Sequence, residues 1–149
     1  MCKLCYNRSM RYLGVDYGTK RVGLALSDEG GVMAFPYKVL KNEKTLVDDI
    51  HNICGTENVN AIVIGESLDL SGQPNKLMDS IKLFANQIHK ALNLPVNFQQ
   101  EFMTTVEARG RAGKEVNDAR KTTKGDQAAA DASAAALILQ RYLDKINQK

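Results

Sequence analysis

Residues 12–28 read YLGVDYGTKRVGLALSD, two apolar runs with a glycine between them, and this stretch decides the fold. Gly18 breaks the first run and the second extends from Val22 to Leu26, a pattern that predicts a tight β-hairpin. Asp16 is a carboxylate inside the first strand, where propensity disfavours it. Such an acid on a rigid strand is typical of a metal ligand or a phosphate-facing group. The alternative is a turn aspartate that hydrogen-bonds the backbone before the glycine.

Two glycines and two cations surround Asp16. Gly14 and Gly18 flank the acid and leave room for another backbone or a phosphate group to come close. Lys20 and Arg21 follow at the tip of the hairpin and place positive charge there. We therefore expect this end of the hairpin to face a phosphate-containing ligand.

The pattern after the hairpin predicts further strands and a helix. Residues 32–40 fit a third antiparallel strand, and Pro36 suits a strand at the edge of a sheet. Apolar residues at helical spacing predict a helix over residues 43–54, which Gly55 is placed to end. The continuous apolar run within residues 58–65 is typical of a buried strand, which we expect to be central and parallel to the first.

The second half of the chain continues the alternation. A helix is expected from Pro74 to Leu92 with one apolar face, followed by a short strand at residues 96–100. Asp126 can cap a last helix that runs through Leu143. The class is therefore α/β, with a mixed five-stranded sheet, a three-strand antiparallel meander plus parallel strands, flanked by helices.

Composition is that of a globular protein, since 44% of the 149 residues are hydrophobic and 25% are charged. We expect an N-terminal extension over residues 1–10 and a single domain over residues 11–146. The longest apolar run, residues 134–139, is too short to cross a bilayer, so no membrane partner is expected. The chain shows no signal-peptide pattern, and we expect a cytoplasmic protein. Monomer and dimer both remain open.

Positive charge is concentrated near the end of the chain. A net charge of +3 permits nucleic-acid binding without requiring it. Residues 109–124, however, carry six cations against Glu115 and Asp118 in a polar stretch without periodicity. This stretch is either a solvated loop or a surface that contacts a phosphate backbone. The six cations are Arg109, Arg111, Lys114, Arg120, Lys121 and Lys124.

Three further acids lie where α/β proteins place their sites. Glu66 belongs to the glycine-bounded loop 65–72 at the carboxyl end of the buried strand, where ligands of open sheets bind. Glu101 ends the last strand, and its alternative role is an exposed strand-end glutamate. Asp131 lies inside the last helix, whose alanines let it approach the sheet. Its alternative role is an acid that complements the helix dipole.

These acids predict a metal centre built from Asp16, Glu101 and Asp131, with Glu66 as a candidate fourth ligand. Carboxylate oxygens suit Mg²⁺ or Mn²⁺, which keep several waters and accept phosphate oxygens. Two such ions about 3.5–4 Å apart can activate a water and stabilise the leaving oxygen of an in-line attack on phosphorus. The expected enzyme is a nuclease whose cations, at the hairpin and in residues 109–124, hold the phosphate backbone.

Four motifs follow one another over residues 11–144. They are Gly14-x-Asp16-x-Gly18-Thr-Lys-Arg21-x-Gly23, the loop 65–72, Glu101-Phe-Met-Thr-Thr105 and the helical segment DASAAALILQ at residues 131–140. Together they resemble the YqgF-type pre-16S ribosomal RNA nucleases, also called Holliday junction resolvase-like proteins. The resemblance implies an RNase H-like fold and a cytoplasmic bacterial protein that acts on the ribosomal precursor and matures the 5′ end of its small-subunit RNA. It also implies divalent-metal catalysis through Asp16, Glu101 and Asp131.

The chain departs from this family at two motifs. The family usually reads Asp-Glu-Arg-Leu-Thr-Thr where residues 100–105 read QEFMTT, so an acid and a phosphate-binding arginine are lost. Glu66 stands where the family more often has an apolar residue. We expect Glu66 to return negative charge to the metal site.

Three other functions compete with a ribosomal RNA nuclease. Asp-x-Gly-Thr also opens the phosphate-binding hairpin of actin-like and sugar-kinase ATPases, but those folds need two lobes and 149 residues supply one. A non-catalytic RNA-binding module for ribosome assembly would keep the fold and tolerate Asp16→Asn. A resolvase for branched DNA stays open because phosphate contacts carry no sequence information.

Overall fold

The computed structural model describes residues 10–68, 76–102 and 124–148. The expected extension at residues 1–10, apart from Met10, and the basic stretch before Lys124 therefore lie outside the described residues. The elements, in chain order, are β1 (Tyr12–Tyr17), β2 (Arg21–Ser27), β3 (Ala34–Lys41), α1 (Leu46–Thr56), β4 (Ala61–Leu68), α2 (Lys76–Leu92), β5 (Val96–Phe102) and α4 (Lys124–Asn147).

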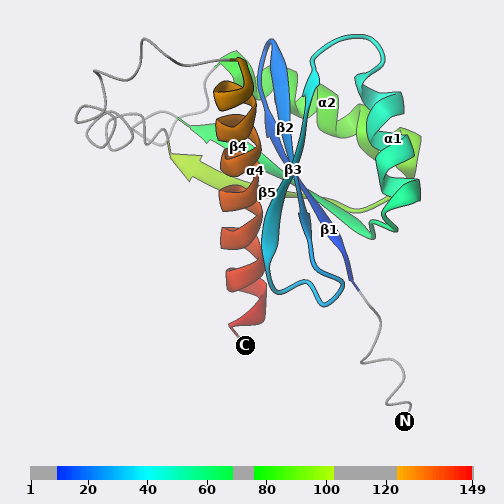
Figure 1. The fold of residues 1–149 in the computed structure, drawn as a ribbon. Helices are drawn as coiled ribbons and strands as arrows, with labels where there is room; N and C mark the ends of the chain where they lie inside the picture. The colour runs from blue at the N-terminus through cyan, green and yellow to red at the C-terminus, as the bar shows by residue number, and fades with distance from the viewer. Residues whose placement is uncertain (1–9, 69–75, 103–123, 149) are drawn as a thin grey trace, which may run out of the picture.

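The strands form a five-stranded sheet in the order β3-β2-β1-β4-β5 (Figure 1). β1, β2 and β3 pair antiparallel, whereas β4 pairs parallel with both β1 and β5. The predicted mixed sheet, with its meander and its parallel strands, is confirmed. β4 is an interior strand, but the central position belongs to β1. β3 lies at an edge, as Pro36 indicated.

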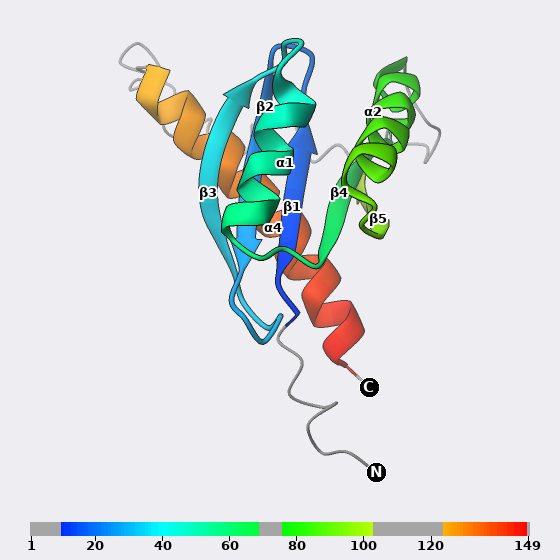
Figure 2. The same ribbon diagram turned by 90° about the vertical axis from the view of Figure 1, so that its right-hand side faces the viewer.

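Helices cover both faces of the sheet (Figure 2). α1 and α2 pack on one face, and α4 runs obliquely across the other. The first face holds the larger apolar cluster, in which strand residues such as Leu13, Leu24 and Ile62 meet helix residues such as Ile50 and Ile88. The second face is thinner. Its cluster consists of Ala25, Val63, Ala135, Ile138, Leu139 and Leu143.

Two of the predicted helix ends are wrong. α1 continues past Gly55 to Thr56, and the chain turns at Asn58, whose φ of 55° lies in the left-handed region. Asparagine tolerates this conformation better than most residues do, so it can end a helix in place of glycine. α4 begins at Lys124, which puts Asp126 inside the helix and not at its N-cap.

No helix in the described parts of the chain is both long enough and apolar enough to span a membrane.

Candidate active site

Asp16 lies near the carboxyl end of β1, on the sheet face that α4 covers. Successive side chains of a strand point to opposite faces, so Gly14 and Asp16 share one face while Val15 and Tyr17 share the other. Tyr17 packs against Phe84 of α2, with 4.9 Å between the ring centroids. Asp16 pairs across the hairpin with Gly23 of β2 and is half-buried.

Three glycines on this face let α4 approach the sheet closely. A Cβ atom at Gly14 would lie 2.7 Å from the Cβ of Leu139, and one at Gly65 would lie 2.7 Å from Cδ1 of Ile138. A Cβ atom at Gly23 would clash with the carbonyl oxygen of Asp131. The glycines come from three adjacent strands, β1, β2 and β4, and so form a shallow bed for the helix.

The contact at Gly23 brings Asp131 to Asp16. The backbone of Asp131 touches the residue of β2 that pairs directly with Asp16. Ala132 and Ala135, which are buried, add to the close approach on the helix side. The predicted approach of an alanine-rich helix is therefore seen, and it depends on the glycines of the sheet as well as on the alanines. Two acids separated by more than a hundred residues reach one face of the sheet.

Arg21 holds the carboxylate of Asp131. Its Nε donates a hydrogen bond of 2.9 Å to Oδ2 of Asp131, and the two side chains are 43% and 33% exposed. Asp131 lies seven residues after Lys124, about two turns into α4, which is too far from the helix end for a dipole role. An ion pair this exposed contributes little stability, so its main effect is to orient the carboxylate.

Glu101 lies at the same edge of the sheet. It belongs to β5 and pairs with Ser67 of β4, two residues beyond the pair of Gly65 and Gln99. β1, β4 and β5 run parallel, so their carboxyl ends share one edge. The backbone of Glu101 is thus at the edge where Asp16 lies, and its side chain is outside the part of the chain that the structure describes.

Glu66 lies on the opposite face. Gly65 faces α4, where Ile138 would meet its Cβ, and the alternation of β4 turns the next residue toward α2. The structure therefore does not bring Glu66 to Asp16. The expectation of a fourth ligand depended on sequence position at a strand end, which does not specify the face.

The predicted phosphate-binding residues are only partly described. Lys20 is exposed beside Gly18 at the hairpin tip, and Asn42 fixes that tip. Nδ2 of Asn42 donates a hydrogen bond of 2.7 Å to the carbonyl oxygen of Gly18. The backbone N–H of Asn42 donates a hydrogen bond of 2.9 Å to the carbonyl oxygen of Lys20. Sequence reasoning missed Asn42, although an asparagine directly after a strand is typical of such turns. Arg109, Arg111 and Lys121 lie outside the described residues; Lys124 opens α4, and its side chain is not described.

The residues at this edge fit a hard divalent cation. Asp16 and Asp131 offer carboxylate oxygens, the donors that Mg²⁺ and Mn²⁺ prefer. In the described residues, no group of three or more histidine, cysteine, aspartate or glutamate side chains is close enough to hold a metal ion. A third carboxylate would have to come from a side chain such as that of Glu101.

A family model described as "RuvX: Holliday junction resolvase" matches residues 10–145. The chain belongs to this family. Curated relatives of this chain include a protein of Syntrophus aciditrophicus, 37% identical over 142 residues, and one of Protochlamydia amoebophila, 34% identical over 143 residues. The matches cover 94% and 90% of this chain and 92% and 93% of the relatives. Both relatives bear the name "Putative pre-16S rRNA nuclease". The resemblance drawn from the four motifs is confirmed, and so is the expected enzyme class, a nuclease.

Solved structures confirm the fold of this RuvX-family chain. Two structures of Thermus thermophilus RuvC, one in complex with a Holliday junction substrate, match with TM-scores of 0.51 and 0.52. They are 16% identical in sequence, and the matches cover 92% and 93% of this chain and 96% of each neighbour. At this identity the likeness concerns the fold alone, which is the RNase H-like fold of RuvC-type resolvases.

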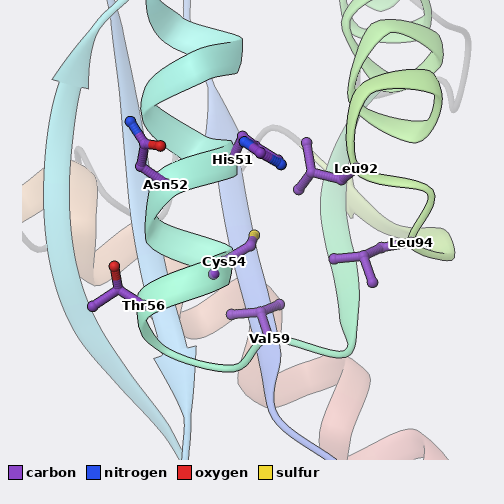
Figure 3. A pocket seen from close by; sticks show the side chains of 8 residues that line it. His51, Asn52, Cys54, Thr56, Val59, Leu92 and Leu94 are labelled. Atoms are coloured by element: carbon purple, nitrogen blue, oxygen red, sulfur yellow. The ribbon is translucent and has the colours of Figure 1, made fainter.

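A separate hollow of about 450 Å³ lies between α1 and the end of α2 (Figure 3). His51 and Cys54 of α1 face Leu92 and Leu94 across it, and Val59 lies at its lower end. Burial raises the pKa of the Cys54 thiol to about 11, so the thiol stays protonated and is a poor nucleophile. This hollow is on the face opposite to Asp16 and does not belong to the acidic site.

Proposed function

We propose that this protein is a metal-dependent endonuclease that hydrolyses phosphodiester bonds at the α4 face of its sheet. The observation that carries the proposal is the contact between Gly23 and the backbone of Asp131. It joins an acid of the last helix to the strand position opposite Asp16. Two acids from distant parts of the chain then stand at the edge where Glu101 lies, one residue before the end of β5.

In this proposal Asp16, Asp131 and Glu101 hold Mg²⁺ or Mn²⁺. When bound, such an ion lowers the pKa of a water and stabilises negative charge at a phosphate group. Arg21 orients Asp131 through the hydrogen bond at 2.9 Å. Lys20, exposed at the hairpin tip, contacts the phosphate backbone, as do Arg21 and the basic residues Arg109, Arg111, Lys121 and Lys124.

The proposed substrate is the precursor of 16S ribosomal RNA, which the nuclease would process at its 5′ end in the cytoplasm. The names of the curated relatives support RNA as the substrate. The family description favours branched DNA as a second candidate, because it names a Holliday junction resolvase. The phosphodiester chemistry of the site would serve either substrate.

Cleavage of a labelled 16S precursor with Mg²⁺ or Mn²⁺ tests the proposal. Asp16→Asn and Asp131→Asn remove one charge each without changing size, and we expect each to lower the rate by about 10²–10³-fold. Asp48→Asn is the matched control, since Asp48 is exposed on α1 at the opposite face. A four-way DNA junction in parallel assays ranks the two substrates. Equal cleavage by wild type and both site variants would contradict the proposed centre.

A further inference from the structure

The outer edge of β5 carries a second concave surface, away from the acidic site. A hollow of about 570 Å³ lies there between α2 and the strand. α2 and β5 run side by side at this edge of the molecule (Figure 2). The lining includes Lys82, Asn86 and His89 of α2, with Pro95, Val96 and Phe98 at the strand.

From this surface we infer a subsite that binds a single-stranded segment of the nucleic-acid substrate, with Phe98 as a stacking platform. The inference rests on the proposed function, because it assigns the substrate class a second contact. Phe98 is 38% exposed, although it stands within a β-strand and pairs in register with the buried Ile64. Aromatic side chains exposed beside cations are the usual platforms for unpaired bases.

Charge around Phe98 favours a polyanion. The residues that line this hollow include no aspartate or glutamate, and Lys82 supplies a positive charge. The opposite edge of the sheet offers a contrast. There a hollow of about 660 Å³ is lined by the aromatic residues Phe35 and Tyr37, but also by Asp28, Glu29 and Glu57, with Arg11 as the lining cation. Both edges expose aromatic rings, but of these two hollows only the one at β5 has no acid among its lining residues.

The remaining side chains suit a base and its phosphate. Asn86 can both donate and accept hydrogen bonds at a base edge, and Lys82 can neutralise a phosphate. The ring of His89 is anchored, since its Nδ1 lies 3.0 Å from the carbonyl oxygen of Leu94. Bases inside a duplex are already stacked on one another, so a ring such as Phe98 selects unpaired nucleotides.

The subsite lies close to the proposed active site. Phe98 precedes Glu101 by three residues of β5, a distance of about 10 Å along an extended strand. Among the described strands β5 is the outermost, so none of them separates its two faces. A single-stranded nucleic acid can therefore pass from Phe98 around the edge of the sheet toward Asp16. The nuclease would thus cut beside an unpaired segment that the β5 edge holds.

Binding to a fluorescein-labelled single-stranded RNA tests the subsite, measured by fluorescence anisotropy in EDTA so that no cleavage occurs. We expect Phe98→Ala to weaken binding at least fivefold. Lys82→Gln should reduce the slope of log K against log salt by about 0.7. Phe35→Ala and Lys38→Gln are matched controls on the β3 edge and should bind as wild type does. A fully paired RNA duplex should show no dependence on Phe98.

Two further variants keep the test independent of folding and of catalysis. Phe98→Leu preserves apolar packing without an aromatic face, so it should bind as weakly as Phe98→Ala while melting near wild type. Asp48→Asn, an exposed change on α1 outside both the subsite and the acidic site, should bind as wild type does. Wild-type affinity in Phe98→Leu, or an equal loss in Phe35→Ala, would overturn the subsite. Loss of binding at Phe98 in a protein that cleaves nothing would support the subsite and refute the nuclease proposal.

Discussion

The two faces of the sheet are built from different residues and have different roles, one in stability and the other in positioning the acids. The face under α1 and α2 is lined by large aliphatic side chains, whereas the face under α4 presents Gly14, Gly23 and Gly65 to the helix. Large side chains bury more apolar area, and therefore the first face supplies most of the stability. Glycines bury little but let a helix backbone touch the sheet. Close approach on the second face is what brings Asp131 to Asp16.

Truncation on the aliphatic face should cost stability without touching the site. Ile62 is fully buried against α1 and α2, and Ile62→Ala should lower the free energy of unfolding by about 2–5 kcal/mol. Urea denaturation measures this loss. Cleavage by the folded protein at low temperature should stay at the wild-type rate. A reduced rate in fully folded Ile62→Ala would mean that the two faces are not separable.

A single methyl group on the glycine face should have the opposite effect. Gly23→Ala places a Cβ against the carbonyl oxygen of Asp131, so α4 must shift and carry that acid away from Asp16. We expect cleavage to fall about a hundredfold, the usual result of a small misplacement at a reacting centre. Gly55→Ala is the control, because a Cβ at that position would have no atom within 4 Å apart from its chain neighbours and its own helix backbone. Equal rates in the two variants would contradict the role of the glycine bed.

Removing the partner of Asp131 should have a smaller effect. Arg21→Gln loses the 2.9 Å hydrogen bond, and we expect cleavage to fall about tenfold, as is usual for groups that orient a ligand. Because the pair is exposed, unfolding free energy should change by less than about 1 kcal/mol. Arg11→Gln breaks a separate ion pair, with Glu57, and should leave the cleavage rate unchanged. An unchanged cleavage rate in Arg21→Gln would contradict the proposal that Arg21 orients Asp131.

The smallest effect concerns the Cys54 thiol, which is buried on the aliphatic face. Burial raises the pKa of Cys54 from 9.0 to about 11, so the folded protein keeps the thiol proton to higher pH than the unfolded chain does. This contribution to stability is therefore complete below about pH 9 and declines as the pH rises toward 11. In a Cys2→Ser/Cys5→Ser background, labelling by a thiol reagent at pH 8 should be slow and should accelerate up to about pH 11. Fast labelling at pH 8 would contradict the raised pKa of Cys54.

Much of the fold could be predicted from the sequence because its signals are local. The apolar runs around Asp16 and within β4, and the edge position of Pro36, follow from periodicity and backbone chemistry over a few residues. The glycine bed could not be foreseen in the same way. Gly14 was expected to admit a backbone or a phosphate, and a Cβ there would indeed lie 3.0 Å from the backbone carbonyl oxygen of Ala135. Which helix supplies that backbone depends on tertiary structure, because Ala135 is distant in the chain.

The site was predictable in its residue types and less so in its geometry. Asp131 could be placed near the sheet from its alanine neighbours, but its partner Arg21 depends on tertiary structure. Glu66 shows the limit of strand-end reasoning, because a shift of one residue in a strand moves a side chain to the other face. Residue 66 falls on the face of α2, and the adjacent Gly65 falls on the face of α4.

A Mn²⁺ titration tests the central claim most directly. Binding is measured as the loss of the free-ion signal in electron paramagnetic resonance. The claim is that Asp16 and Asp131 form one metal centre through the contact at Gly23. We predict that wild type binds Mn²⁺, that Asp16→Asn and Asp131→Asn each weaken binding strongly, and that the folded Gly23→Ala variant weakens it too. Undiminished Mn²⁺ binding in both aspartate variants would contradict a metal centre at this face.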